Sequence, residues 1–431
     1  MSDSTSPAVS LHRGLGRWDL TAIGVNQVIG GSVFLMPAAV AAQIGAWSWM
    51  ALAAVGLLSL LIALNFAEAG SRFDGTGGAY LYTRAAFGRF ASFEVGWMLW
   101  FTRVTSWSSV VNGLADALSY YWPGIRTGAP RVALIAGTIA IIAAINVRGI
   151  RQSAWTVNLL TIGKLLPLVL FIVLGLPHVH AAALAPAGAL TWTQLSTAAL
   201  FLVFAYGGYE VVPVPAGEAR DPKRAVPFAM ITTILVVTAV MTLVQVVALG
   251  TLPGLAASRT PLADAALGFL GVGGALLMTT GAAVSMSGNN VGQALSGSRN
   301  LFALAEQGDI PRMFGWVHPR YRTPAVAIVF TATVALGLAL SGSFTTLAAA
   351  SAVARLVVYV GTCASVLALR RQSGRAAFTI PGGPIVPVVA SLASAAIVFG
   401  ANALQLEVGL IALAIGAVLF AVARINAKPR T

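Results

Sequence analysis

Charged side chains are scarce in this sequence of 431 residues. Aspartate, glutamate, lysine and arginine together make up 9% of it, whereas hydrophobic residues make up 58%. Because a soluble domain carries about 25% charged residues, this chain lacks the polar surface that a water-soluble fold needs. The composition predicts an integral membrane protein surrounded by a lipid bilayer. For such a protein the position of the charges matters more than the net value of +13, and we expect no nucleic-acid partner.

Cysteine and histidine are nearly missing as well. The one cysteine, Cys363, excludes an intrachain disulfide and most thiolate metal sites, and the four histidines show no paired spacing. The sequence has no G-x-x-x-x-G-K-[ST] loop, which argues against ATP-driven transport. It also has no filter-like repeat of a channel and no His/Asp set of an embedded enzyme. We therefore expect no metal, no cofactor and no enzymatic activity.

Long apolar segments dominate what is present. A membrane-spanning helix needs about 20 apolar residues, and twelve segments qualify. They cover residues 18–44, 46–67, 91–121, 131–147, 153–176, 193–217, 227–250, 264–299, 324–341, 344–369, 385–403 and 406–423. The segment at 264–299 is longer than the hydrocarbon core, so we expect it to tilt or project. The sequence thus predicts an all-α protein with twelve transmembrane helices and no soluble domain.

The 26 lysines and arginines are distributed unevenly around these segments. Three of them lie in loops on one side and three lie within spans, while the others lie on the opposite side or in the tails. The first two groups are Arg126, Arg131 and Arg259, and Arg103, Lys164 and Arg355. Cytoplasmic loops are enriched in Lys and Arg. The asymmetry predicts a multi-pass protein of the cytoplasmic (inner) membrane with both termini in the cytoplasm.

Two segments are interrupted by adjacent glycines. The first contains N-Q-V-I-G-G-S at residues 26–32, and the sixth contains F-A-Y-G-G-Y-E at residues 204–210. Glycine pairs are common places for a helix to bend or break, and a break inside a membrane survives only where protein or a water-filled cavity surrounds it. Five spans separate the two interruptions. Because five is odd, a second five-helix unit enters the membrane upside down, with a binding site between the two units.

These motifs resemble those of the amino acid–polyamine–organocation (APC) transporters. The resemblance covers about residues 14–423 and rests on six stretches. They are I-G-G-S-V-F-L-M-P at 29–37, T-G-G-A-Y-L-Y at 76–82, N-V-R-G at 146–149, K-L-L-P-L at 164–168, F-A-Y-G-G-Y-E at 204–210 and A-G-E-A-R-D-P-K-R-A-V-P at 216–227. One departure is that the family usually has Gly-Ser-Gly at the first interruption, whereas this chain has Gly30-Gly31-Ser32, which moves the hydroxyl by one position.

The resemblance implies a leucine-transporter-type 5+5 inverted repeat of the amino acid permease type. Helices 1 and 6 would be broken at the midplane, and two extra helices would follow at the C-terminus. Repeat one would cover about 18–176, repeat two about 193–369 and the extra helices about 385–423. Residues 14–423 would form one transporter domain between cytoplasmic tails at 1–13 and 424–431.

The two interruptions supply the predicted substrate site. The N–H groups and positive helix end at Gly30, Gly31 and Ser32 suit a carboxylate. Carbonyls at the other helix ends suit an ammonium group, although the glycines are equally compatible with close helix packing alone. A polar cluster at 289–293 either lines the cavity or bonds to neighbouring helices, and Phe204 either gates the site or packs in the core. The predicted substrate-binding set is Val28, Ile29, Gly30, Gly31, Ser32, Phe204, Ala205, Tyr206, Gly207 and Asn290.

Four charged residues within the apolar segments are candidates for coupling or pairing, because such charges are costly in a membrane. Glu210 is either a proton carrier, as the matching glutamate of acid-resistance antiporters in the family suggests, or a static hydrogen-bond partner. By resemblance, Lys164 places its ammonium where related symporters bind sodium; alternatively it is a strut for the carbonyls of helix one. Arg103 and Arg355 either cap carbonyls, pair with Glu94 or Glu210, or contact an anionic substrate.

These features predict a secondary active transporter that works by alternating access on a small-molecule substrate, an amino acid by resemblance. Coupling to H⁺ or sodium-independent transport is expected from Lys164 and Glu210. The alternative is an exchanger of amino acids and amines of the polyamine type, and a channel is the less favoured class.

Overall fold

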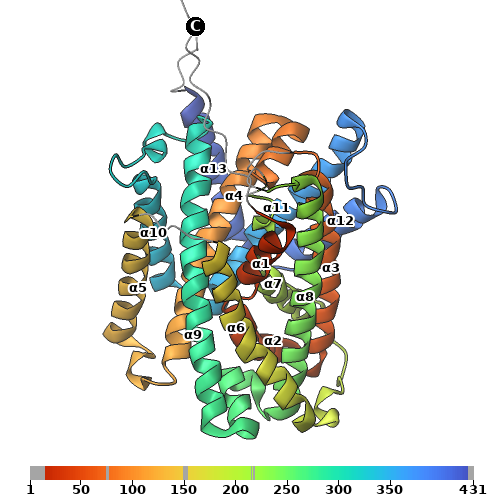
Figure 1. Cartoon of the computed structure of the whole chain (residues 1–431), viewed down its shortest axis with the longest axis vertical. Helices are drawn as coiled ribbons and strands as arrows, with labels where there is room; N and C mark the ends of the chain where they lie inside the picture. Colours follow the sequence, from red (N-terminus) through yellow and green to blue (C-terminus); the bar gives the residue numbers. More distant parts are fainter. Residues whose placement is uncertain (1–14, 74–76, 149–153, 215, 217–218, 426–431) are drawn as a thin grey trace, which may run out of the picture.

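The computed structural model describes residues 15–73, 77–148, 154–214, 216 and 219–425, and these form thirteen α-helices (Figure 1). The only strand-type pairing among these residues is an isolated bridge between Leu15 and Ala219. The helices are α1 (Arg17–Val28), α2 (Ser32–Ile44), α3 (Ser48–Gly70), α4 (Ala79–Leu118), α5 (Gly128–Arg148), α6 (Ala154–Gly175), α7 (Trp192–Tyr206), α8 (Pro222–Thr251), α9 (Pro261–Glu306), α10 (Ala325–Ser341), α11 (Phe344–Ser373), α12 (Ile385–Phe399) and α13 (Ala403–Ile425). Each of the twelve predicted apolar segments contains α-helix, which confirms the all-helical prediction.

Seven stretches of the described chain are long and apolar enough to cross a membrane. They are Ser32–Gly70, Gly128–Arg148, Thr161–His178, Pro222–Thr251, Pro261–Glu306, Phe344–Ser373 and Ala403–Ile425, and α7, α10 and α12 are shorter apolar helices. Outer helices also expose large apolar side chains, such as Ile141 on α5, Ile162 on α6 and Val418 on α13. Exposing so much apolar surface to water is unfavourable, whereas lipid tails solvate it. The chain is a multi-pass membrane protein.

The residues at the N-terminal ends of α7, α8 and α9 explain where these helices begin. Pro222 and Pro261 begin α8 and α9, where the missing N–H costs no hydrogen bond. Thr191 caps α7, because its hydroxyl accepts a 3.2 Å hydrogen bond from the backbone N–H of Gln194.

Two long helices change direction at a glycine. Gly88 in α4 has a φ of +80° and Gly271 in α9 has a φ of +65°, a region that favours glycine. The kink in α9 lies near its beginning, and the part after Gly271 is still longer than the hydrocarbon core.

The helices that carry the two interruptions lie in the middle of the bundle. In Figure 1, α1, α2 and α7 occupy its centre, between α3 and α8 on one side and α9 on the other. α1 packs against α6 and α8, and α7 packs against α2, α3 and α11. Any site between the interruptions is therefore enclosed by helices.

Two polar networks join helix ends at the end of the bundle where α13 finishes (Figure 1). The buried carboxylate of Glu68 in α3 accepts hydrogen bonds from Arg370 of α11 at 2.7 and 2.5 Å. In the second network, Asp309 accepts from Arg89 at 2.6 Å and from Tyr80 at 3.0 Å. Burial and the neighbouring Asp309 carboxylate raise the pKa of Tyr80 to about 12, so its hydroxyl remains a donor at physiological pH.

Candidate functional site

The first interruption separates α1 from α2. α1 ends at Val28 and α2 begins at Ser32, and no side chain caps the N-terminal end of α2. A Cβ atom on Gly30 would lie 2.6 Å from the amide nitrogen of Asn289, and one on Gly31 would lie 3.0 Å from Met286. Both contacts come from α9. The glycines therefore let α9 approach the backbone and also leave an uncapped helix end.

The second interruption follows α7. The helix ends at Tyr206, and Gly208 has a φ of +134°. A Cβ atom on Gly208 would lie 2.7 Å from the backbone carbonyl of Gln27, and the hydroxyl of Ser32 donates to the carbonyl of Ala205 at 3.3 Å. The two interruptions, far apart in the sequence, therefore lie against each other.

A small pocket opens at this meeting point. It is lined by Gln27, Val28, Gly30, Gly31, Ser32, Ser106, Val110, Phe204, Gly207, Asn289, Gln293 and Arg355. Its volume of about 10 Å³ matches one water molecule. Admission of anything as large as an amino acid therefore requires the surrounding helices to move apart.

Six predicted site residues line this pocket, namely Val28, Gly30, Gly31, Ser32, Phe204 and Gly207. Ile29, Ala205, Tyr206 and Asn290 are not among the residues that line it. The hydroxyl of Tyr206 donates to the carbonyl of Leu52 in α3 at 2.9 Å. Asn290 is fully buried, and its amide oxygen and nitrogen have no hydrogen-bond partner.

Phe204 is part of the pocket wall. Its ring packs edge-on against Phe344 of α11, with 6.0 Å between the ring centroids. The aromatic side chain therefore connects the end of α7 to the start of α11, a placement compatible with either predicted role, gate or core packing.

Lys164 of α6 contacts the C-terminal end of α1. Its ammonium donates to the carbonyls of Asn26 and Ile29, each at 3.1 Å. Ser285 of α9 adds weaker bonds to the carbonyls of Ile29 at 3.4 Å and Gly30 at 3.2 Å. A cation thus neutralises the partial negative charge of a helix C-terminus.

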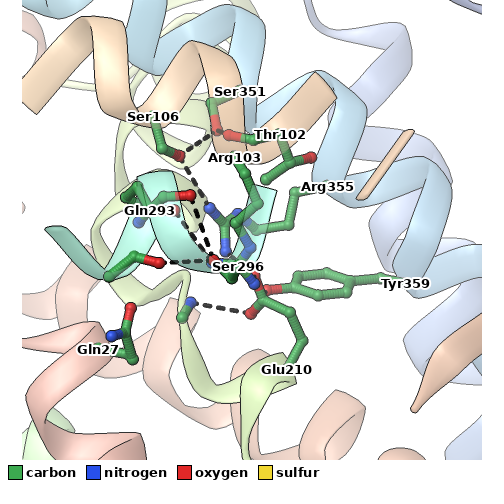
Figure 2. A network of polar contacts seen from close by, with 12 residues as sticks. Gln27, Thr102, Arg103, Ser106, Glu210, Gln293, Ser296, Ser351, Arg355 and Tyr359 are labelled. Atoms are coloured by element: carbon green, nitrogen blue, oxygen red, sulfur yellow. Dashed lines mark hydrogen bonds and ion pairs between the residues drawn. The ribbon is translucent and has the colours of Figure 1, made fainter. Parts of the chain in front are cut away.

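Glu210 lies at the centre of a buried charge cluster (Figure 2). One carboxylate oxygen accepts from Arg103 of α4 at 2.9 Å and forms an ion pair with Arg355 of α11. The other oxygen accepts from the backbone N–H of Gly208 at 2.8 Å and from the hydroxyl of Tyr359 at 3.3 Å. The side chains of the three ions are at most 2% exposed.

Neutral side chains complete the cluster from the opposite side (Figure 2). Gln293 accepts from Arg103 at 3.3 Å, and Ser106 accepts from Arg355 at 3.3 Å. The Nε atoms of both arginines are buried and have no hydrogen-bond partner. Of the alternatives that the sequence left open for the arginines, the structure shows pairing with Glu210.

Three residues of the pocket wall were not predicted from the sequence, namely Gln27, Ser106 and Val110. Ser106 belongs to a hydroxyl-rich run, T-S-W-S-S at residues 105–109, that closely follows Arg103. Such a run in an apolar helix is a usable signal, because hydroxyl groups in membranes bond across helices. No group of three or more potential metal ligands occurs in the part of the chain that the structure describes.

Comparisons with known proteins agree with this architecture. A family model described as "Amino acid permease" matches residues 15–421. The methylthioribose transporter of Bacillus subtilis (strain 168) is 28% identical over 407 residues, covering 90% of this chain and 88% of the relative. The serine/threonine exchanger SteT of the same organism is 30% identical over 388 residues, covering 85% and 86%. The branched-chain amino acid permease BcaP, also from that organism, is 27% identical over 419 residues, covering 90% and 88%.

Proposed function

The chain belongs to the amino acid permease family of the APC superfamily, and we propose that it is a secondary active transporter of amino acids that works by alternating access. The observation that carries the proposal is the contact between two helix interruptions at a buried polar pocket. Two relatives named for serine/threonine exchange and branched-chain amino acid transport support the same substrate class. We further propose one transporter domain at 14–423 in the inner membrane, with cytoplasmic tails at 1–13 and 424–431.

A second structural correspondence supports the 5+5 inverted repeat. The third and eighth spans, like the first and sixth, are five spans apart. Their helices α4 and α9 kink near their N-terminal ends at Gly88 and Gly271, both at positive φ. Paired irregularities at the same spacing are typical of two units with a common fold. In this arrangement α12 and α13 lie outside the repeat.

The substrate α-amino acid is proposed to bind mainly to backbone. Its carboxylate docks at the N–H groups of Gly31 and Ser32 at the uncapped end of α2. Its ammonium docks at the carbonyls of Val28 and Phe204, each of which accepts one bond across the interruption and retains a lone pair.

Two other residues of the predicted substrate-binding set, Ile29 and Ala205, have backbone carbonyls that already accept hydrogen bonds from side chains. The carbonyl of Ile29 accepts from Lys164 and Ser285, and that of Ala205 accepts from Ser32. These contacts make both carbonyls part of the scaffold of the site. The two bonds to Ile29 occupy both of its lone pairs, whereas the bond from Ser32 leaves one on Ala205, so the ammonium dock is narrowed to Val28, Phe204 and Ala205.

The charged residues support sodium-independent transport. The ammonium of Lys164 holds the carbonyls at the end of α1, so a sodium ion there would meet a positive charge. Glu210 accepts bonds from four donors, which favours a permanently charged, static carboxylate over a proton carrier. The alternative of amine exchange is disfavoured, because two arginines and one glutamate leave this region positive.

The function is tested with purified protein in detergent and in proteoliposomes. We expect at least one amino acid to raise the melting temperature, as a ligand of the folded state does, and the same amino acid to be taken up into vesicles. Stabilisation and uptake by amines alone, with none by amino acids, would contradict the proposal.

A labelling experiment tests the topology. Single cysteines at residues 177–190, in a Cys363→Ala background, should react with a membrane-impermeant reagent in intact cells. The physical reason is that this loop has no Lys or Arg, only His178 and His180, and lies between basic-flanked loops of the other side. Labelling only after lysis would overturn the topology and the inverted repeat with it.

Substituting Gly31 tests the backbone dock. Gly31→Val places a branched side chain at the end of α2, where even a Cβ atom lies 3.0 Å from Met286. We expect the affinity for every substrate to fall by about tenfold or more, about 1.4 kcal/mol, because the side chain blocks the approach of the carboxylate to the backbone N–H groups. Gly288→Val in α9 is the matched control, because a Cβ atom there meets nothing within 4 Å. Equal binding by the Gly31→Val protein and the wild type would exclude this dock.

A further inference from the structure

The buried cluster around Glu210 has an excess of positive charge. Arg103 and Arg355 share one carboxylate, and the side chains of all three are at most 2% exposed. Glu94, also on α4, lies nine residues from Arg103, about 13 Å along the helix axis, next to Gly416 of α13. It therefore does not balance the second arginine. An unbalanced charge inside a membrane protein is unfavourable and marks an ion or substrate path.

The two arginines differ in their relation to the pocket. Arg355 lines the pocket, whereas Arg103 does not. A Cβ atom on Gly207 would collide with the guanidinium of Arg355, so this group lies directly against the interruption after α7. Ser106 and Gln293, the neutral partners of the cluster, line the same pocket. Arg355 is thus the cationic part of the pocket wall.

We propose that Arg355 binds the side-chain carboxylate of an acidic amino acid, with Ser106 and Gln293 as neutral partners. A guanidinium is planar and can donate two parallel hydrogen bonds to a carboxylate. The Nε of Arg355 has no other hydrogen-bond partner. The inference rests on the proposed function, in which the main-chain groups of the substrate bind at the helix ends. A zwitterionic amino acid brings no net charge, whereas aspartate or glutamate brings one negative charge and balances the excess.

The test compares acids with their isosteric amides. Binding of L-aspartate and L-glutamate is measured against L-asparagine and L-glutamine by thermal stabilisation and by competition for uptake in proteoliposomes. We expect the wild type to bind at least one acid about tenfold or more tightly than its amide, as a charge-assisted hydrogen bond implies. Equal affinity for acid and amide overturns the proposal without any variant.

Two matched variants assign the preference to one side chain. Arg355→Gln and Arg103→Gln each remove one charge and leave Glu210 with one arginine, so each cluster becomes neutral. We expect Arg355→Gln to bind the acid no more tightly than its amide. Arg103→Gln should keep more of the preference than Arg355→Gln, because the guanidinium that contacts the acid remains. Equal loss in both variants would mean a general charge effect and would overturn the role of Arg355.

The remaining outcomes separate this inference from the proposed function. If the Arg355→Gln protein binds neither amides nor acids, the α-carboxylate of the substrate binds at Arg355 and the side-chain assignment is wrong. If the wild type transports only neutral amino acids, the inference fails and amino acid transport stands. If no amino acid is bound or transported, the proposed function itself fails.

Discussion

Glu210→Gln is expected to destabilise the folded protein by about 3–5 kcal/mol, the usual effect of removing one partner from a buried ion pair. The substitution leaves Arg103 and Arg355 facing each other without a carboxylate, inside a cluster whose charged side chains are at most 2% exposed. The measurement is the melting temperature of the purified protein in detergent, together with the fraction that elutes as a single species.

Tyr359→Phe is the control for this experiment. It removes the 3.3 Å hydrogen bond from the Tyr359 hydroxyl to the same carboxylate but leaves all three charges in place, and a hydrogen bond to a charged group is worth about 1.5–3 kcal/mol. Combining Glu210→Gln with Arg103→Gln should recover part of the stability, because one uncompensated cation is gone. A Glu210→Gln protein as stable as the wild type would show that the carboxylate is not a structural counter-charge, and the proton-carrier alternative would then regain support.

Lys164→Ala is expected to reduce uptake about tenfold or more while folded protein remains detectable. The substitution removes the 3.1 Å donor from the carbonyl of Asn26 and leaves that of Ile29 with only the 3.4 Å bond from Ser285, and an unsatisfied group costs about 1–3 kcal/mol. Uptake by the wild type should be the same in sodium and in potassium media, because the ammonium takes the place of a cation.

Ser285→Ala is the control for Lys164, since it removes only weaker bonds of 3.4 and 3.2 Å from the same helix end. Its effect on uptake should be smaller. Steep sodium dependence of the wild type would contradict the role of Lys164 as a substitute cation. Unchanged pH dependence in the alanine variant would instead identify Lys164 as a strut.

The small pocket between the interrupted helices constrains how a substrate enters the proposed site. The pocket of about 10 Å³ is far smaller than the roughly 300 Å³ or more of a usual ligand site. Substrate entry therefore needs relative motion of the helices around the interruptions.

The sequence by itself determined the membrane class, the helical segments and the position of the glycine pairs. These are local properties: an apolar run of sufficient length has only a helix available to it in lipid, and adjacent glycines weaken a helix wherever they occur. The prediction placed Asn290 in the substrate-binding set, whereas the pocket is lined by Asn289 and Gln293. Residues four apart share a helix face, so the spacing of Asn289 and Gln293 was a signal that the prediction did not use.

Only the tertiary structure decided which charges meet. Arg103 and Arg355 are 107 and 145 residues from Glu210, and no spacing rule connects positions on two helices and the turn after a third. The direction of Tyr206 was equally undetermined, because the rotation of α7 against α3 decides whether its hydroxyl reaches the pocket or Leu52. Helix formation depends on neighbouring residues, whereas the partner of a buried charge depends on how complete helices pack.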